Sequence, residues 1–392
     1  MKKRILYVHH VSSVGGASFC LLNVIKAVDR DRYEPIVLLK NIGPLSIELE
    51  KIGVEVLYLP TLSAIPYNKS LFSLRSCVNY AKVLLSLRKF KSIIKRNHID
   101  IIYLNNMMLY PYLYVSKDFL TIVHVREHWP LDEHRNQLRV AQRALYKYAS
   151  KVIAINGYSS KMFAECSFKT TIIHDWISFN ERFDGPTLKD VINEEPNGKK
   201  VYLFTGGLHW TKGTLEVVDV FSSSIKDKNS RLLILGVDKK KNNSNTYNLK
   251  RFFRLGRKDY RQTVEQLISS DDRILIAPSI YKLGRILKDA YCNLSFFTIH
   301  HANLTLAESI ILGTPTIAAE TDESIEYSDS GNLAVLYEFK NKKAFKDAIV
   351  YLNDNYETIK LKIENNAARV KQMFSPENNI ALLNQVYESL SK

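Results

Sequence analysis

The sequence predicts an α/β protein made of two doubly wound domains that face a cleft. Short apolar runs alternate with helix-length segments along most of the chain, which is typical of a parallel sheet covered on both faces. A polar stretch at 178–200 carries glycine and proline residues and suits a linker. After this stretch the same alternation starts again, which indicates a second domain of the same kind.

Length, composition and charge limit the possible classes of protein. The chain has 392 residues, 46% of them apolar, so it can bury the cores of two ordinary domains. Its net charge of +15 is compatible with nucleic acid, an anionic membrane surface or anionic small molecules as partners. No apolar run is long enough to span a membrane, and the first residues, MKKRILYVHH, lack a signal peptide's apolar region. We therefore expect a cytoplasmic protein.

The first half opens with a strand at Arg4–His9, which leads through Gly15 and Gly16 into a helix. Further strands are expected at 35–39, 54–59, 100–104, 119–125, 152–155 and 170–173. The glycine pair is compatible with a tight turn between strand and helix, or with close approach of the backbone to a substrate at a helix N-terminus. The local pattern alone favours the turn, because the full dinucleotide-binding spacing is absent.

The second half repeats this pattern from Val201 onward. Strands are expected at 201–205, 231–236, 273–277, 292–297 and 315–319. After Leu336 we expect helices only, at 342–353, 358–373 and 376–390. In the turn after the first of these strands, Lys212 precedes a helix, where a lysine can reach a phosphate held by backbone N–H groups. The alternative is a solvated surface lysine, but the strand, turn and helix around it favour phosphate.

The stretch 292–320 is the most informative part of the chain. A strand ends near His300 and His301, a helix begins near Asn303, and Glu308 lies within its first two turns. Such a unit places a carboxylate where α/β proteins bind ligands, so Glu308 can accept hydrogen bonds from ribose hydroxyls. It can equally be a partner of the helix dipole, and both roles can hold together. The histidines suit a proton carrier or a hydrogen-bonding pair, although a structural role is more common at a strand end.

Arg126 and Glu127 end a strand of the first half, at the same carboxyl rim. Ionisable groups there suit catalysis or anion binding, and an ion pair within a loop is the equally good alternative. Nothing in the sequence has the spacing of a metal site.

Basic residues gather in three groups that also carry apolar residues. The groups are Arg75, Lys82, Arg88, Lys89, Lys91, Lys95 and Arg96; then Arg135, Arg139, Arg143, Lys147 and Lys151 at intervals of four; then Lys239–Lys241, Lys250, Arg251, Arg254, Arg257, Lys258 and Arg261. A charge run is usually a solvated face. Together the three groups favour an anionic membrane surface over nucleic acid, because no nucleic-acid-binding motif accompanies them.

With these motifs in view, the chain resembles the GT-B glycosyltransferases, and most closely family four of the retaining, nucleotide-sugar-dependent enzymes. The resemblance covers nearly the whole chain. It rests on ILYVHHVSSVGGAS, VIAINGYSSKMF, IIHDWISFNERF, FTGGLHWTKGTLEVVDVF and, most specifically, LAESIILGTPTIAAE.

The resemblance implies two Rossmann-like domains and a last helix that crosses back onto the first domain. We place these parts at 1–185, 186–375 and 376–392. It also implies roles for single residues. Gly15 and Gly16 would face the donor phosphates and sugar, Lys212 would bind the diphosphate, and Glu308 would bind the ribose, with Gly207, His301, Asn303 and Leu304 as further donor contacts.

Three positions depart from the family pattern. His300 stands where an acidic residue often contacts the donor sugar, Gly207 stands where an arginine usually accompanies the lysine, and Arg126-Glu127 replaces a frequent His-Asp pair. We assign Arg126, Glu127 and His300 as candidate catalytic residues, with neither a metal nor another cofactor.

The expected activity is transfer of a sugar from a nucleotide diphosphate sugar to a hydroxyl, with retention at the anomeric carbon. The expected acceptor is a lipid-linked saccharide, as in surface polysaccharide assembly. We expect the enzyme to be attached peripherally to the inner face of the membrane, without nucleic acid as a partner. The alternatives are a non-catalytic GT-B scaffold that binds a nucleotide sugar or acidic polymer, and a sugar-nucleotide epimerase.

Overall fold

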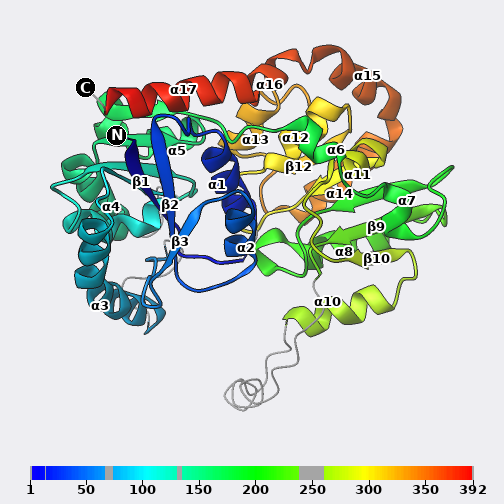
Figure 1. The fold of residues 1–392 in the computed structure, drawn as a ribbon. Coiled ribbons are helices and arrows are strands. Elements are labelled where there is room, and N and C mark those ends of the chain that lie inside the picture. The colour runs from blue at the N-terminus through cyan, green and yellow to red at the C-terminus, as the bar shows by residue number, and fades with distance from the viewer. Residues whose placement is uncertain (1, 14, 67–73, 130–134, 238–259, 391–392) are drawn as a thin grey trace. The chain divides into compact units, whose positions relative to one another are not determined.

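The chain forms two compact units, Met1–Trp176 with Met373–Lys392, and Ile177–Gln372. The computed structural model describes residues 2–13, 15–66, 74–129, 135–237 and 260–390. Each unit contains one sheet in which every strand pairing is parallel, with helices in between (Figure 1). The prediction of two doubly wound α/β domains is therefore confirmed.

The first unit has a seven-stranded sheet of order β3-β2-β1-β4-β5-β6-β7. Its strands are β1 Lys3–Val8, β2 Tyr33–Leu39, β3 Glu55–Tyr58, β4 Ile101–Leu104, β5 Leu120–Val125, β6 Lys151–Ala154 and β7 Thr170–Ile172. Its helices are α1 Gly16–Lys26, α2 Pro44–Lys51, α3 Leu74–Arg96, α4 Arg135–Tyr148, α5 Gly157–Lys161 and α17 Pro376–Ser389, with the 3₁₀ segments η1 Met107–Tyr114 and η2 Ala164–Lys169. Strand order changes direction between β1 and β4.

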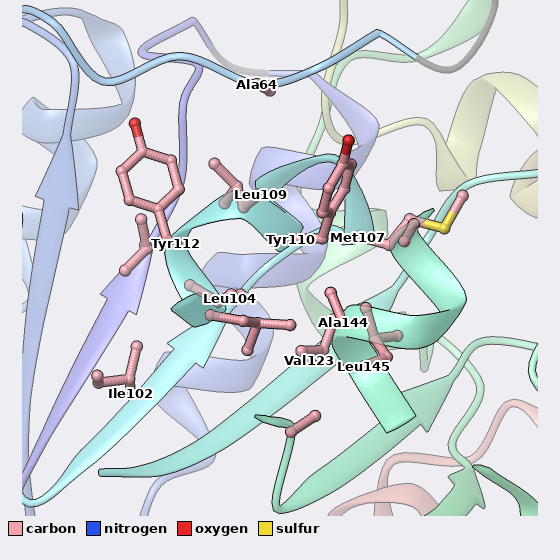
Figure 2. Close-up of a cluster of buried hydrophobic side chains, with 14 of the residues drawn as sticks. Ala64, Ile102, Leu104, Met107, Leu109, Tyr110, Tyr112, Val123, Ala144 and Leu145 are labelled. Atoms are coloured by element: carbon pink, nitrogen blue, oxygen red, sulfur yellow. The ribbon is translucent and has the colours of Figure 1, made fainter. Parts of the chain in front are cut away.

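Two hydrophobic cores cover the two faces of this sheet. One core joins the sheet to α3, η1 and α4. Figure 2 shows Leu104 of β4 below Tyr110 of η1, and Val123 of β5 beside Leu145 of α4. The other core joins the opposite face to α1, α2 and α17. Successive side chains of a strand point to opposite faces of the sheet, so each apolar strand contributes residues to both cores.

The last helix, α17, belongs to the first unit, as predicted. Its Tyr387 hydroxyl lies 2.8 Å from the hydroxyl of Tyr7 on β1, and both side chains are buried. The Asn379 side chain also accepts a hydrogen bond from the His174 backbone N–H, at 2.9 Å. These two buried polar contacts fix the helix on the sheet, in addition to its apolar face.

The second unit has a six-stranded sheet of order β10-β9-β8-β11-β12-β13. Its strands are β8 Lys200–Phe204, β9 Ser230–Leu235, β10 Ile274–Ala277, β11 Cys292–Ser295, β12 Thr316–Ala319 and β13 Val335–Tyr337. Its helices are α6 Phe179–Phe183, α7 Leu188–Ile192, α8 Thr214–Ser224, α10 Tyr260–Ser269, α11 Gly284–Asp289, α12 Leu304–Leu312, α13 Asp322–Tyr327, α14 Lys342–Asp354, α15 Tyr356–Asn366 and α16 Ala368–Met373, with the 3₁₀ segment η3 Trp210–Lys212. Here strand order changes direction between β8 and β11.

The structure differs from the sequence-based expectations at three places. β13 was not expected, because a strand of three residues at the sheet edge is too short to show a period. The helix expected at 358–373 is two helices, α15 and α16, separated at Ala367. The first unit ends at Trp176 and the second at Gln372, earlier than the boundaries we placed after 185 and 375. The reason for the first shift is that α6 packs against α11 of the second unit.

Candidate active site

The loop after β8 meets the loop after β9 backbone to backbone. Gly207 has a φ of 56°, in the left-handed region that favours glycine. A Cβ at this position would lie 2.6 Å from the Gly236 carbonyl oxygen, so a side chain there would force the two loops apart. The Thr214 hydroxyl donates to the Gly207 carbonyl at 2.8 Å and ties this turn to the start of α8. Gly207 therefore has a structural requirement that the sequence did not reveal.

Lys212 ends η3 in this loop and is partly exposed. Its Nζ lies 4.6 Å from the ring centre of Phe297, which follows β11. Burial lowers the pKa of Lys212 to about 7. Phosphate binding by Lys212 stays a prediction, and so does its alternative, a solvated surface lysine. A desolvated cation attracts an anion more strongly than one in water does.

The loops after β8 and β11 are bonded to each other. The Thr298 backbone N–H donates to the Thr211 carbonyl at 3.1 Å, and its hydroxyl donates to the Trp210 carbonyl at 2.9 Å. These two strands flank the point where strand order reverses, which is where open α/β sheets bind ligands. These two hydrogen bonds thus hold the loops that carry Lys212 and Phe297 together at that point.

The histidines lie on aromatic rings of the same loop region. The His301 ring is 5.4 Å from Phe297, the ring that Lys212 also contacts, and the His300 ring is 4.5 Å from Phe339. Both histidines are partly exposed. The structure therefore brings Lys212 and His301 to one aromatic ring, while His300 contacts a different one.

Asn303 caps α12, as the helix start in the sequence suggested. Its Oδ1 accepts from the Leu306 backbone N–H at 3.3 Å, and its Nδ2 donates to the Ser295 hydroxyl at 2.8 Å. Leu304, the first residue of α12, is partly buried. Both polar ends of the Asn303 side chain are engaged, so it holds the β11–α12 connection in place.

Glu308, the fifth residue of α12, is only 2% exposed and forms an ion pair with Arg182 of α6. Burial raises the pKa of Glu308, and the charge of Arg182 lowers it, with a net upward shift. The contacts join Glu308 to Arg182, whereas Lys212 and His301 share Phe297. Sequence reasoning missed Arg182, because we assigned it to the linker end of the first domain.

In the first unit, Arg126 is enclosed in a buried polar network. Its guanidinium forms an ion pair with Asp175, donates from Nε to Asn105 Oδ1 at 3.1 Å, and lies 3.2 Å from His124 Nδ1. Asn105 Nδ2 in turn lies 3.1 Å from His9 Nδ1. Arg126, Asn105 and His9 directly follow β5, β4 and β1, so this network lies at the strand reversal of the first sheet.

Sequence reasoning named Arg126 in this network and missed the other members. Two of these members directly follow a buried strand, and a polar residue in that position lies at the carboxyl edge of the sheet, where ligands bind. By that rule His9 and Asn105 were candidates on the same grounds as Arg126.

Glu127, next to Arg126 in the chain, binds backbone N–H groups. Its Oε2 accepts from Met107 at 3.0 Å and from Arg126 at 3.1 Å. Burial nevertheless raises the pKa of Glu127 to about 7, and the hydrogen bonds and the Arg126 charge offset this only in part. Glu127 is therefore a carboxyl whose protonation state changes near neutral pH.

Gly15 and Gly16 do not have the packing role that the sequence pattern favoured. Gly15 is extended, with φ of −152°, and a Cβ on either glycine would meet no described atom within 4 Å. Neither backbone strain nor packing in the described part of the chain requires glycine here. Close approach of a ligand to the start of α1 stays a prediction, and the competing explanation has lost its support.

The described residues contain no cluster of three or more His, Cys, Asp or Glu side chains suited to a metal ion. The polar groups gathered at the two strand reversals are instead cations, amides and single carboxylates.

Comparison with known protein families finds a match within the second unit. Residues 187–370 match the family of glycosyl transferases group 1. Over this segment, slightly less than half of the chain, the second unit is similar to the group 1 glycosyltransferases. This match confirms the predicted enzyme class, a hexosyltransferase-type glycosyltransferase.

Solved structures agree with this glycosyltransferase assignment at the level of the fold. HepE of Anabaena in complex with UDP-glucose has a TM-score of 0.72 at 17% identity, over 99% of each chain. Sucrose-phosphate synthase from Thermosynechococcus elongatus has 0.74 at 15% identity, over 99% of each chain. A glycosyltransferase from Rickettsia africae has 0.68 at 15% identity, over 100% of this chain and 99% of that one. The predicted GT-B fold is thereby confirmed, while no curated protein matches the sequence.

The buried carboxyl of Glu127 leads to a prediction about stability. Its pKa of about 7 lies above the usual value of 4.5, so ionisation is less favourable in the folded protein than in the unfolded chain. While Glu127 is protonated in both the folded and the unfolded state, its ionisation does not change the free energy of unfolding. As the pH rises from about 4.5 to about 7, it lowers the free energy of unfolding by on the order of 3 kcal/mol. Glu127→Gln keeps an acceptor for both N–H groups and removes the ionisation.

The measurement is chemical unfolding of the wild type and Glu127→Gln from pH 4.5 to 8. The stability of the variant relative to the wild type should increase through this range and level off above pH 7. A difference that is constant with pH would contradict the assignment of a near-neutral pKa to Glu127.

Proposed function

We propose that this glycosyltransferase moves a sugar from a nucleoside diphosphate sugar to the hydroxyl of a saccharide acceptor, with retention of configuration. The observation that carries the donor proposal is the desolvated Lys212 at the strand reversal of the second unit, held beside the β11–α12 loop. HepE, which shares the fold, is solved in complexes with UDP-glucose and with UDP and glucose. Retention and a lipid-linked acceptor rest on the resemblance to family four.

In this proposal, different residues contact the leaving diphosphate, the nucleoside and the donor sugar. Lys212 stabilises the charge that develops on the leaving diphosphate, where a desolvated cation is most effective. Glu308 accepts hydrogen bonds from the ribose hydroxyls. His300 contacts the donor sugar, where the family often has a carboxylate, and a neutral or cationic imidazole there would select a different sugar substituent.

Arg126 and Glu127 act on the acceptor side of the reaction. Arg126 fixes Asn105 and Asp175 through its guanidinium, and Asn105 contacts His9. Glu127 holds the start of η1 and, with a pKa of about 7, can exchange a proton near neutral pH. The proposed chemistry uses neither a metal nor another cofactor.

Release of nucleoside diphosphate from a panel of nucleoside diphosphate sugars tests this function. Lys212→Ala should lower kcat/KM on the order of 100-fold, because a charge that stabilises the leaving group is lost. Glu308→Ala should raise the KM for the donor. Lys226→Ala, which removes an exposed lysine from the same unit, is the matched control and should leave turnover unchanged.

The alternatives give different results in this experiment. Turnover unchanged by both site variants would overturn the site assignment. Nucleotide binding without turnover of any donor would favour the scaffold, and an altered nucleotide sugar formed without acceptor would favour the epimerase.

The near-neutral pKa of Lys212 predicts a pH-dependent affinity for nucleoside diphosphate. The bound diphosphate favours the charged lysine, so binding takes up a proton when the free lysine is neutral. Affinity should fall as the pH rises above about 7, by up to about tenfold per pH unit. Calorimetric titration from pH 6 to 9 measures this dependence. Lys212→Arg should bind with little change over the same range, and a wild type that behaves in the same way would contradict the prediction.

We also propose that the first unit attaches to an anionic membrane surface. α3 exposes Leu84 and Leu85, each 69% exposed, beside the exposed cations Lys82, Arg88 and Lys89. This is the combination that binds anionic lipid through apolar insertion and charge. No described helix has the length and apolar character required to cross a membrane. The site of attachment is therefore sought on a surface helix.

A second basic helix supports this proposal. α4, which packs on the same face of the sheet as α3, exposes Arg135, Arg139, Arg143 and Lys147. Lys151, which we expected to continue this ridge, instead begins β6. Of the third basic group, only Arg261 lies within the described residues, and it pairs with Glu265 on α10.

Flotation with liposomes of anionic and of neutral lipid at low salt tests the attachment. The wild type should float with anionic vesicles only, and Leu84→Glu/Leu85→Glu should lose binding. Leu361→Glu, at a 59% exposed leucine of α15 in the second unit, is the matched control and should still bind. Equal flotation of the wild type and the Leu84/Leu85 variant would contradict the assignment of α3.

A further inference from the structure

Glu308 is a buried carboxyl that forms an ion pair with one cation, Arg182. Its side chain is 3% exposed and that of Arg182 is 9% exposed, so both partners of the ion pair are withdrawn from water. An isolated ionised carboxylate at such a site would be strongly disfavoured. The ion pair occupies Oε1, and Oε2 is buried without a hydrogen-bond partner among the described residues. One carboxylate oxygen thus faces Arg182, and the other has an unused capacity to accept hydrogen bonds.

The local packing holds the Arg182 guanidinium in a defined place. Its Nη1 donates to the Tyr281 carbonyl, and its Cζ lies 5.5 Å from the centre of the Tyr281 ring. A Cβ at Gly284 would lie 3.0 Å from the Arg182 carbonyl carbon and oxygen. The absence of a side chain at Gly284 therefore permits the close approach of α6 to the start of α11. Contacts with the backbone at Tyr281 and Gly284 therefore hold Arg182 in position.

Other charged groups near α12 do not replace Arg182. The elements packed against α12 carry the following charged residues: Arg285, Lys288 and Asp289 on α11; Asp322, Glu323 and Glu326 on α13; and Glu357, Lys360, Lys362 and Glu364 on α15. Burial raises the pKa of Glu308, and among the described charges only Arg182 acts to lower it. The ionisation of Glu308 therefore depends on one residue.

We propose that Arg182 is a positioning residue for donor binding: it keeps Glu308 ionised and turned so that its second oxygen accepts from a ribose hydroxyl. The inference rests on the proposed function, in which Glu308 contacts the ribose. An ionised carboxylate accepts hydrogen bonds from both hydroxyls of a ribose, whereas a protonated carboxyl must use one oxygen as a donor. Loss of the Arg182 charge would therefore weaken recognition of the sugar of the nucleoside while leaving recognition of the diphosphate unchanged.

The experiment compares a ribonucleoside diphosphate with its 2′-deoxy counterpart. The probe is whichever of ADP, CDP, GDP and UDP binds the wild type most tightly, and the dissociation constants of both forms are measured by calorimetry between pH 6 and 9. The wild type should prefer the ribose form about tenfold or more at pH 7. Arg182→Met should lose most of this preference at pH 7 and regain it toward pH 9, where the carboxyl ionises without its partner. Arg182→Lys, which keeps a cation, should retain the preference.

Two further variants separate this role from a structural one. In a Glu308→Gln background no charge needs compensation, so adding Arg182→Met should change binding by less than about twofold. This double variant also remains informative if Arg182→Met alone does not fold. Lys282→Met breaks the exposed Lys282–Asp184 pair in the same region and serves as the matched control, with unchanged binding expected.

The outcomes distinguish the role of Glu308 in binding the ribose from the role of Arg182 in positioning Glu308. If Glu308→Gln leaves the preference for ribose unchanged, the proposed function of Glu308 is overturned. If Glu308→Gln abolishes the preference but Arg182→Met keeps it at pH 7, only the role of Arg182 is overturned. A loss in Arg182→Met that is independent of pH, and that adds fully to the loss in Glu308→Gln, would show a structural role and also overturn the inference.

Discussion

The reversal of strand order in each parallel sheet is the constraint on which the rest of the structure depends. Helices cover both faces of such a sheet, so the carboxyl ends of its strands are the positions left for polar groups. In the first unit the reversal lies between β1 and β4, and His9 and Asn105, which follow them, are in contact. In the second it lies between β8 and β11, and Lys212 and Phe297, which follow them, are in contact. The same geometric rule thus places both polar centres.

The surroundings of each ionisable group in these centres determine its protonation state. The Lys212 ammonium lies against an aromatic ring, and desolvation lowers its pKa to about 7. Glu127 is buried with backbone N–H partners, which only partly offset desolvation. Glu308 and Arg126 are buried too, but each has an oppositely charged partner within its own unit. The protonation of each group near neutral pH therefore depends more on its partner than on its residue type.

Much of the fold could be predicted from the sequence, since each apolar run is long enough to show where a buried strand lies. The prediction failed where that signal is weak, as at the three-residue strand β13 and at the interruption between α15 and α16. Within the site, Glu308 and Lys212 stood out because each follows a strand and a turn. The ring that Lys212 shares with His301 and the network around Arg126 could not be predicted, because they depend on side chains that are distant in sequence.

Arg182 shows why local pattern alone did not define the site. The glycines and prolines that follow it suggested a linker, so our boundary after residue 185 placed it in the first domain. The segment that matches the glycosyltransferase family model begins at 187, five residues after Arg182. Yet the charge of Glu308 in the second unit is buried, and a buried carboxylate requires a compensating cation. The second unit begins before α6, at the residue that follows Trp176, and so contains both partners of this ion pair.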